Sequence, residues 1–370
     1  MIQPIILLIL KALEGRGAER MVATLASAYA DLNYDVHVLC LEYTRDMPLD
    51  SRVHVLVVPY NQVFAEQVFA PDSEQANAYR AVAQRIDDYV LGNIGVAALI
   101  LANIYKINCI MAYSQLTNII NVLHTAVSRQ FQEKLATMPA QTMAHLKTVY
   151  GAHPCSCVSD GARQDLLALI GNVNKTTTIY NPCAVDDIKK AAKQPLALSQ
   201  FGITYKNYMI HVASFDSMKG HHELLHAYAK TARSYPLVLV GKGRLESEIK
   251  QLATALGIDD CVKFLGFQAN PYTLIASAAL LLLTSKFEGF GYTIVEAQAL
   301  GVPVISTDCP FGPRELLPRQ NLVPVDDIEG LVSLMNRVMA HPQNYQVPFN
   351  QQLRSESIAS QYLQFGQLID

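Results

Sequence analysis

Two glutamates, Glu288 and Glu296, enclose the glycine-containing segment "EGFGYTIVE" directly after the apolar run 279–283. A spacing of eight residues turns a helix by about 80° beyond two full turns, so the two acids would not share one helix face well. A strand, a loop and a helix that begins near Thr293 explain the spacing better, because the two glycines let the loop turn tightly and approach a ligand. Carboxylates placed in this way could hold the hydroxyl groups of a sugar and of a ribose.

The same segment allows two interpretations of Glu296. Thr293-x-x-Glu296 matches a capping box, in which the threonine caps the helix and the glutamate returns a hydrogen bond, and Glu288 would then be a solvated charge. In the functional interpretation, amides at the helix N-terminus stabilise a phosphate, and the carboxylates bind the hydroxyls of a nucleotide sugar.

The N-terminal half of the chain alternates apolar, strand-like runs with helix-like stretches. Such alternation is typical of parallel βαβ units in a doubly wound sheet. The expected strands are residues 4–10, 35–41, 53–58, 107–112, 119–124 and 155–159, and the expected helices are residues 18–32 and 131–148.

The pattern restarts after Asn181-Pro182, which is a turn signal, and the polar stretch 186–194 is expected to be a linker. The predicted fold is therefore α/β, with two Rossmann-like, doubly wound parallel-sheet domains that face each other across a cleft. The expected divisions are an N-terminal domain 1–185, a C-terminal domain 186–350 and a C-terminal helix 351–370 that packs back on the N-terminal domain. The strands expected in the second domain are residues 207–215, 236–243, 261–267, 278–285 and 302–308.

Composition argues against several classes of function. The 370 residues carry a net charge of −3, so nucleic acid is not expected to be a partner. The seven cysteines are scattered without metal-ligand spacing, which indicates free thiols in a reducing compartment, and we expect a cytoplasmic protein. The apolar runs 4–10 and 96–104 are too short to span a membrane. Gly241 and Gly243 follow a predicted strand, but Glu246 stands where a dinucleotide fingerprint needs a third glycine, so no nicotinamide or flavin is expected.

Seven segments, in order along the chain, resemble the retaining glycosyltransferases of family 4, which have the GT-B fold and include many enzymes of bacterial cell-surface polysaccharide and lipopolysaccharide synthesis. The segment from Glu288 to Glu296 resembles the family's EX7E motif. The resemblance covers essentially the whole chain and is strongest over residues 207–317. The EX7E segment continues into "AQALGVPVISTDCPFGPREL". The other six segments are "GAERMVATLASAYADLNYDVHVLCL", "VSDGARQDLL", "IYNP", "VASFDSMKGHHELLHAYA", "VGKGRLESEI" and "VKFLGF".

The resemblance implies that the C-terminal domain binds a nucleotide-diphosphate sugar as the donor. In this family Glu296 would bind the ribose, Glu288 would lie near the transferred sugar, and Lys219 would contact the diphosphate. Without the motif, Lys219 would be taken for a surface lysine before a glycine. Other residues implied in the donor site are Phe290 and Gly291, through their amides, and the loop glycines Gly289, Gly17 and Gly243.

The chemistry implied by the resemblance needs a fixed positive charge. As the glycosidic bond breaks, negative charge builds on the leaving phosphate, and Lys219 with nearby amide dipoles would stabilise it. The sequence has no Asp-x-Asp segment to hold a divalent metal, so neither a metal nor a cofactor is expected. Retention is explained by front-side attack, in which the leaving phosphate takes the proton of the acceptor, so neither Glu288 nor Glu296 is assigned as a nucleophile. Hydrolysis by paired carboxylates is the competing chemistry.

The N-terminal domain would bind the acceptor. The family often has a histidine near the transferred sugar at the position of His124, although a lone histidine after a strand is also a common structural residue. Glu19 would lie near the cleft on the acceptor side, or it would only favour the helix dipole. The stretch 129–150 is either an interfacial helix or a core-packing helix interrupted by Pro139. We expect a glycan or lipid-linked acceptor, with peripheral contact at the inner face of the cell membrane, and a UDP-sugar as donor.

Two other functions fit the same sequence. The chain could be a nucleotide-sugar epimerase or hydrolase on the same fold, which would act on the donor without a sugar acceptor. It could also be a degenerate, non-catalytic subunit that binds a nucleotide sugar. Ser214 favours the degenerate subunit, because the family usually has an arginine at this position, five residues before the lysine.

A second departure suggests compensation for the missing arginine. Arg16 stands where the family has the first glycine of its GGAER loop, and Arg314 in "GPRE" is another candidate cation, although it could simply pair with a nearby acid. If Arg16 supplies the charge missing at Ser214, Arg16→Ala should weaken donor binding and turnover, measured by titration and by steady-state kinetics. An effect no larger than that of a distant surface substitution would contradict this hypothesis.

Overall fold

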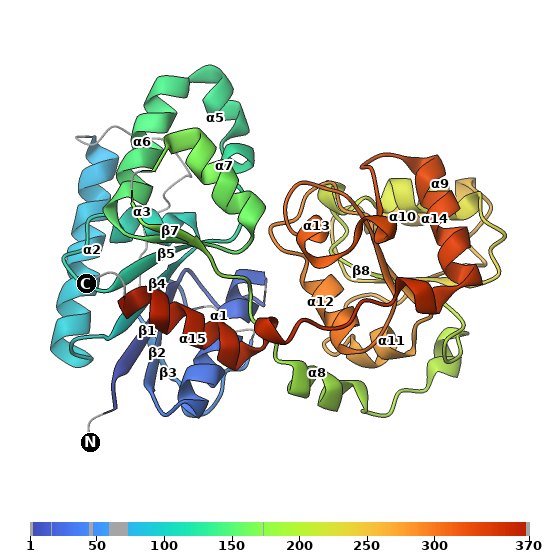
Figure 1. The fold of residues 1–370 in the computed structure, drawn as a ribbon, viewed down its shortest axis with the longest axis horizontal. Helices are drawn as coiled ribbons and strands as arrows, with labels where there is room; N and C mark the ends of the chain where they lie inside the picture. The colour runs from blue at the N-terminus through green and yellow to red at the C-terminus, as the bar shows by residue number, and fades with distance from the viewer. Residues whose placement is uncertain (1–2, 16, 44–46, 59–72, 173, 368–370) are drawn as a thin grey trace. The chain divides into compact units, whose positions relative to one another are not determined.

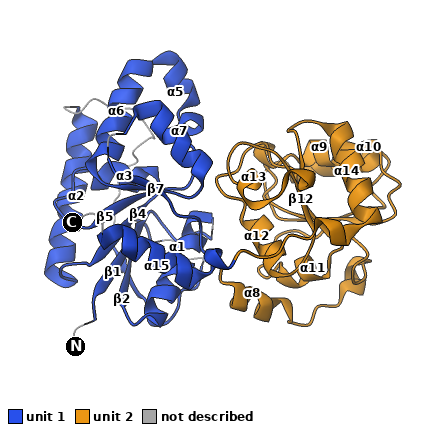
Figure 2. Ribbon diagram, viewed as in Figure 1, with its two compact units in different colours: residues 1–182, 351–370 blue, residues 183–350 orange. Residues whose placement is uncertain are grey.

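The computed structural model describes residues 3–15, 17–43, 47–58, 73–172 and 174–367. It contains two compact units (Figure 2): residues 1–182 and 351–370 form unit 1, and residues 183–350 form unit 2. The first boundary therefore lies between Pro182 and Cys183, slightly before the expected division at 185/186. Each unit is an α/β domain with a parallel sheet, as the alternation of strands and helices predicted.

Within its described residues, unit 1 has a seven-stranded parallel sheet in the order β3-β2-β1-β4-β5-β6-β7 (Figure 1). The central strands read as continuous apolar runs because helices cover a parallel sheet on both faces. The strands are β1 (Ile5–Leu10), β2 (Asp35–Cys40), β3 (His54–Val57), β4 (Leu99–Asn103), β5 (Ile119–Leu123), β6 (Cys155–Cys157) and β7 (Thr176–Thr178). The helices are α1 (Gly17–Asp31), α2 (Glu74–Asn93), α3 (Tyr105–Met111), α4 (Val127–Gln130), α5 (Gln132–Thr137), α6 (Pro139–Ala152), α7 (Asp160–Ile170) and α15 (Ser355–Gln367).

Unit 2 has a six-stranded parallel sheet in the order β10-β9-β8-β11-β12-β13. The strands are β8 (Met209–Val212), β9 (Leu237–Val240), β10 (Val262–Phe264), β11 (Leu280–Leu283), β12 (Val304–Thr307) and β13 (Leu322–Val323). The helices are α8 (Val185–Ala192), α9 (His221–Ala229), α10 (Glu246–Ala255), α11 (Tyr272–Ser277), α12 (Tyr292–Ala299), α13 (Pro313–Leu316) and α14 (Ile328–Ala340).

Both sheets have one point at which the strand order reverses. In unit 1 the chain builds outward from β1 in one direction and then from β4 in the other, and in unit 2 the corresponding pair is β8 and β11. Loops that leave the carboxyl ends of two such strands diverge to opposite faces of the sheet. The crevice between them is where open α/β sheets bind ligands.

The structure corrects three predicted elements. Residues 107–112 were predicted as a strand, but they belong to helix α3, in which Ile107, Ile110 and Met111 are buried at helical spacing. The predicted linker 186–194 lies largely in helix α8, whose acids are in the first turn and whose lysines are in the last turn, as the helix dipole favours. The predicted helix 131–148 is divided into α5 and α6 at Pro139, which begins α6 because proline suits the first helical turn.

The C-terminal helix α15 packs against α1 in unit 1 (Figure 1). Tyr29 and Tyr362 are both fully buried. The hydroxyl of Tyr29 donates to the carbonyl of Ala359 at 3.4 Å, and Ser156 donates to the hydroxyl of Tyr362 at 3.2 Å. The last helix therefore completes the core of the unit that the first half of the chain forms.

Tyr362→Ala should destabilise unit 1 by about 3–5 kcal/mol, because it leaves a cavity the size of an aromatic ring between α15 and the sheet. Urea unfolding with pulse hydrogen-exchange labelling measures this for unit 1 peptides separately from unit 2 peptides. Gln364→Ala, on the exposed face of the same helix, is the control and should change stability little. Equal stability of the two variants would show that α15 is not part of the folded core.

Candidate functional site

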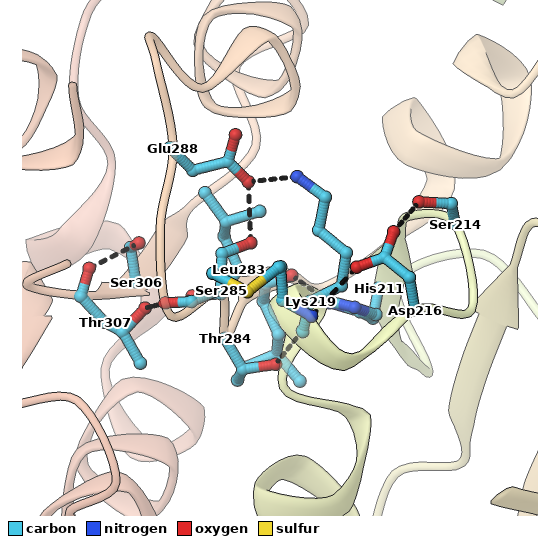
Figure 3. Close-up of polar contacts among 12 residues, drawn as sticks. His211, Ser214, Asp216, Lys219, Leu283, Thr284, Ser285, Glu288, Ser306 and Thr307 are labelled. Carbon is cyan, nitrogen blue, oxygen red and sulfur yellow. Dashed lines mark hydrogen bonds and ion pairs between the residues drawn. The ribbon is translucent and has the colours of Figure 1, made fainter. Parts of the chain in front are cut away.

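The strand reversal in unit 2 brings together two loops with predicted site residues. The loop after β8 carries Ser214 and Lys219, and the loop after β11 carries Glu288. Lys219 Nζ lies 2.8 Å from Glu288 Oε1 (Figure 3), and the two side chains are 25% and 13% exposed. The lysine and the first glutamate of the opening segment, which are far apart in the sequence, therefore form an ion pair at the carboxyl edge of the sheet.

The two loops are held together by backbone contacts. Thr284 donates from its hydroxyl to the carbonyl oxygens of Lys219 and Gly220, at 3.1 Å each, and the Lys286 amide donates to the Met218 carbonyl at 2.8 Å. Gly220 has φ +67°, and a Cβ atom there would lie 1.9 Å from the Thr284 carbonyl oxygen. Glycine is therefore required after Lys219, since any side chain would push the two loops apart.

Glu288 is itself fixed by the strand that precedes it. Ser285 donates to Glu288 Oε1 at 2.6 Å, the same oxygen that contacts Lys219. Thr307, at the end of β12, donates to the Ser285 carbonyl (Figure 3). The carboxylate is thus oriented by Ser285, which follows β11 and is itself bonded to the end of β12. The sequence prediction did not include Ser285 or Thr284, although both are polar residues at the carboxyl end of an apolar strand.

Glu296 does not act in a capping box. Helix α12 begins at Tyr292 with Gly291 as its N-cap, at φ +97°, so Thr293 lies inside the helix and does not cap it. Glu296 is 2% exposed, and its carboxylate accepts a hydrogen bond from the hydroxyl of Tyr272 at 3.3 Å. The capping interpretation is therefore wrong. No sequence signal identified Tyr272, because it lies on α11, outside the motif.

Two further glycines allow close packing of the loops at this edge. A Cβ atom at Gly312, which has φ +86°, would lie 2.2 Å from the Phe290 carbonyl oxygen, so the "CPFGPREL" segment packs directly on the "EGFG" segment. A Cβ atom at Gly243 would lie 2.5 Å from the Phe215 carbonyl oxygen. Gly243 therefore has a packing role next to the loop after β8, and its expected role in donor binding stays a prediction.

The two other candidate positions in unit 2 have acidic neighbours. Ser214 is exposed and donates to Asp216 Oδ2 at 2.5 Å, while Asp216 Oδ1 accepts from the Met218 amide. Arg314 forms a bidentate pair with Asp308, with both distances 3.0 Å, and its side chain is 60% exposed. In this structure Arg314 therefore pairs with a nearby acid, which was the second of the two options expected for it. Gly289 lies in the same loop as Glu288.

The remaining candidates belong to unit 1. Gly17 begins α1, and Glu19 is in its first turn. Arg16 lies outside the described residues. His124 directly follows β5, and its Nε2 lies 3.1 Å from Asn103 Oδ1.

Asn103 fixes the tautomer of His124. Its amide nitrogen donates to the carbonyls of Leu101 at 3.0 Å and Ile9 at 3.3 Å, so its oxygen must accept from His124 Nε2–H. Burial lowers the pKa of His124 to about 4, so the ring is neutral near pH 7 and keeps a lone pair on Nδ1. That nitrogen can accept a hydrogen bond from a hydroxyl group but adds no positive charge.

The residues that the structure describes include no group of three or more histidine, cysteine, aspartate or glutamate side chains that could hold a metal ion. They also include no helix that is long and apolar enough to cross a bilayer.

Buried histidines next to the loop after β8 give unit 2 a pH dependence. His211 and His221 have T-shaped rings 4.7 Å apart, and burial lowers their pKa values to about 4 and about 2. Because these rings bind protons near pH 6.5 only in the unfolded chain, unit 2 should be fully stable above that pH and should lose stability as the pH falls towards 4.

The expected loss is about 2 kcal/mol per histidine between pH 6.5 and pH 5. His211→Asn can still donate to the Leu282 carbonyl, which His211 Nδ1 contacts at 2.9 Å, but it cannot take up a proton. The variant should therefore show a smaller slope of unfolding free energy against pH, measured by urea unfolding with pulse labelling of unit 2 peptides. If the unfolding free energy of the variant is lower than that of the wild type by the same amount at every pH, this explanation is ruled out.

The residues of this site lie in a part of the chain that is similar to a known family. Residues 198–355 match the family model described as "Glycosyl transferases group 1". The chain is 28% identical over 196 residues to the lipopolysaccharide 1,6-galactosyltransferase of Salmonella typhimurium, a match that covers 51% of this chain and 53% of that protein. It is 31% identical over 159 residues to the N-acetylgalactosamine-N,N'-diacetylbacillosaminyl-diphospho-undecaprenol 4-alpha-N-acetylgalactosaminyltransferase of Campylobacter jejuni, covering 43% and 42%. The chain thus spans about half the length of these curated relatives.

The fold is similar to that of solved structures over almost the whole chain. The crystal structure of the Anabaena protein HepE in complex with UDP and glucose matches with a TM-score of 0.69 and 21% identity, and the match covers 99% of this chain and 98% of that one. The sucrose-phosphate synthase of Thermosynechococcus elongatus matches with a TM-score of 0.73 at 17% identity, covering 99% and 95%. The chain therefore has the GT-B fold, and its residues 198–355 are similar to the group 1 glycosyl transferases.

Proposed function

We propose that this protein is a retaining glycosyltransferase of the family 4 type that moves a hexose or N-acetylhexosamine from a UDP-sugar to a glycan or lipid-linked acceptor. The observation that carries the proposal is the Lys219–Glu288 pair at the strand reversal of unit 2. Support also comes from relatives named as lipopolysaccharide and diphospho-undecaprenol glycosyltransferases, and from a structural neighbour crystallised with UDP and glucose. Cell-surface polysaccharide synthesis at the inner face of the membrane is the setting that we propose.

In this proposal Lys219 neutralises the charge that develops on the leaving phosphate. Its side chain is 25% exposed and its ammonium group is held in place by Glu288, so little reorganisation is needed when the glycosidic bond breaks. Glu288 uses one oxygen, Oε1, for Lys219 and Ser285. Its other oxygen is then available to a hydroxyl of the transferred sugar. No metal ion takes part in the steps that we assign to these residues.

Glu296 would bind the ribose of the donor. A buried carboxylate is costly unless hydrogen bonds satisfy it, and Tyr272 supplies one of these in the structure. The two ribose hydroxyls would supply others. The acceptor hydroxyl would attack the transferred sugar on the same face from which the phosphate departs. The leaving phosphate would take the proton of that hydroxyl, so that neither glutamate forms a covalent bond to the sugar.

A second candidate is a non-catalytic subunit that binds a nucleotide sugar. It is favoured by Ser214, which stands where the family usually has an arginine and donates a hydrogen bond to the acid Asp216. Both candidates predict donor binding, but only the enzyme predicts that the sugar is transferred or, slowly, released to water. Conversion of the donor to an epimer would instead support the epimerase.

Thermal unfolding with UDP, GDP, ADP and CMP, and with their sugar derivatives, should identify the donor. A ligand at about a hundred times its dissociation constant adds roughly 2.7 kcal/mol of stability, and we expect UDP and a UDP-sugar to do so. Lys219→Gln and Glu296→Gln each remove a charged hydrogen-bonding group and should weaken that binding about tenfold or more. Lys230→Gln is the matched control, because Lys230 forms an exposed ion pair with Glu329 in the same unit.

The outcomes separate the proposals. Stabilisation by one nucleotide that is lost in Lys219→Gln and Glu296→Gln, but kept in Lys230→Gln, would establish the donor site. Release of UDP in the presence of an acceptor glycan would then support the transferase. If no nucleotide stabilises the wild-type protein, the assignment of a donor site to unit 2 is wrong.

A further inference from the structure

Unit 1 contains a pocket of about 360 Å³ at its own strand reversal. Its lining comes from the residue that follows β1, from the start of α3 after β4, and from the residues that follow β5. These strands are neighbours at the centre of the sheet, so the pocket occupies the crevice in which such sheets bind ligands. The lining residues are Lys11, Ile104, Tyr105, Lys106, Asn108, Leu123, His124, Thr125, Gln130 and Tyr150. We call this the unit 1 pocket.

The lining of the unit 1 pocket is positively charged. Among the residues that the structure describes, the lining includes two lysines, Lys11 and Lys106, and no carboxylate. His124 is neutral near pH 7, since burial lowers its pKa, so the charge comes from the lysines alone. The other polar groups in the lining belong to neutral side chains such as Thr125 and Gln130. A concave surface with one sign of charge concentrates ligands of the opposite sign, although the whole chain is slightly acidic.

Lys11 has an acidic partner beside the pocket. Lys11 Nζ lies 3.3 Å from Glu42 Oε2, and the two side chains are 40% and 36% exposed. An exposed pair of this kind contributes little to stability, so an anionic ligand can take the place of Glu42 at small cost. Glu42 is therefore expected to oppose the binding of an anion in the unit 1 pocket.

The backbone at the pocket is strained. Ile104 has φ +68° and ψ 153°, a conformation that β-branched residues avoid. The buried side chain of Asn108 lies against it: with its amide turned so that the nitrogen faces the carbonyls, Asn108 donates to Ile104 O at 3.1 Å and Ala102 O at 2.7 Å. Strain that the surrounding structure maintains is concentrated at binding and catalytic sites. The strained residue directly precedes Tyr105 and Lys106, so it fixes how they enter the pocket.

We infer that the unit 1 pocket binds a phosphate group of the acceptor between Lys11 and Lys106, an inference that rests on the proposed transferase function. The pocket volume is at the small end of the range for ligand sites, which suits a phosphate with one sugar-sized group, so the chain of a lipid carrier would have to extend beyond the pocket. Lysine binds phosphate as a compact point charge, and two lysines suit a phosphate better than a neutral sugar. The phosphate would belong to an isoprenyl diphosphate carrier or to a phosphorylated sugar of the glycan.

Calorimetric titration of the full chain tests this inference with three probes: geranyl diphosphate, glucose 6-phosphate and uncharged glucose. Geranyl diphosphate represents the lipid carrier, and glucose 6-phosphate represents the phosphorylated glycan. At least one phosphate probe should bind, its affinity should fall with added salt, and glucose should bind more weakly. Lys11→Gln and Lys106→Gln should each weaken binding of the phosphate probe about tenfold, because each removes a charged hydrogen-bond donor.

Three further variants separate this site from other effects. Glu42→Gln should tighten binding of the phosphate probe several-fold, a gain that misfolding cannot produce. Lys147→Gln, at an exposed lysine of α6 in the same unit, should leave the affinity for the phosphate probe unchanged. Lys219→Gln should weaken UDP binding in unit 2 but leave binding of the phosphate probe unchanged.

The inference is overturned if neither phosphate probe binds, or if Lys11→Gln and Lys106→Gln have no more effect than Lys147→Gln. It is also overturned if Lys219→Gln weakens binding of the phosphate probe, because the probe would then occupy unit 2. Failure of the proposed function has a different signature, the absence of UDP binding to the wild-type protein. Binding of geranyl diphosphate alone identifies a lipid carrier, and binding of glucose 6-phosphate alone identifies a phosphorylated glycan.

Discussion

The close approach of two backbone segments at Gly220 and Thr284 is the constraint on which the site in unit 2 depends. The Thr284 hydroxyl ties the carbonyls of Lys219 and Gly220 to the end of β11, and only glycine leaves room for this contact. Because the loop after β8 is held at this point, the Lys219 side chain reaches Glu288 on the neighbouring loop. The ion pair is a consequence of backbone packing, so a change at Gly220 would move the charge even though it leaves both charged residues in place.

The two units use the same topology with different electrostatics. Each has a crevice where the strand order reverses, and each crevice contains lysine. In unit 2 Lys219 is mostly buried and pairs with Glu288, so that part of the site is nearly neutral before any ligand arrives. In unit 1 Lys11 pairs with the exposed Glu42, and the described part of the pocket lining contains no acid. The first arrangement orients a single cation, whereas the second creates a local positive field.

Sequence reasoning predicted the features that follow from local pattern. The alternation of buried strands and helices indicated two doubly wound units, and the ordered motifs selected Lys219 and Glu288. It failed where tertiary packing overrides the pattern: the apolar run at residues 107–112 is a helix, and Thr293 lies inside α12 because the glycine before it caps the helix. Tyr272 and Asn103 had no sequence signal at all, because each acts on a residue that only the fold brings near.

Neutral histidines are a consequence of the same packing. His211 and His221 lie behind the loop that presents Lys219, and a proton on either ring would place a second buried charge close to that lysine. Burial prevents this near pH 7, as it does for His124 in unit 1. Near pH 7, therefore, these histidines add no positive charge to that of the lysines at each crevice.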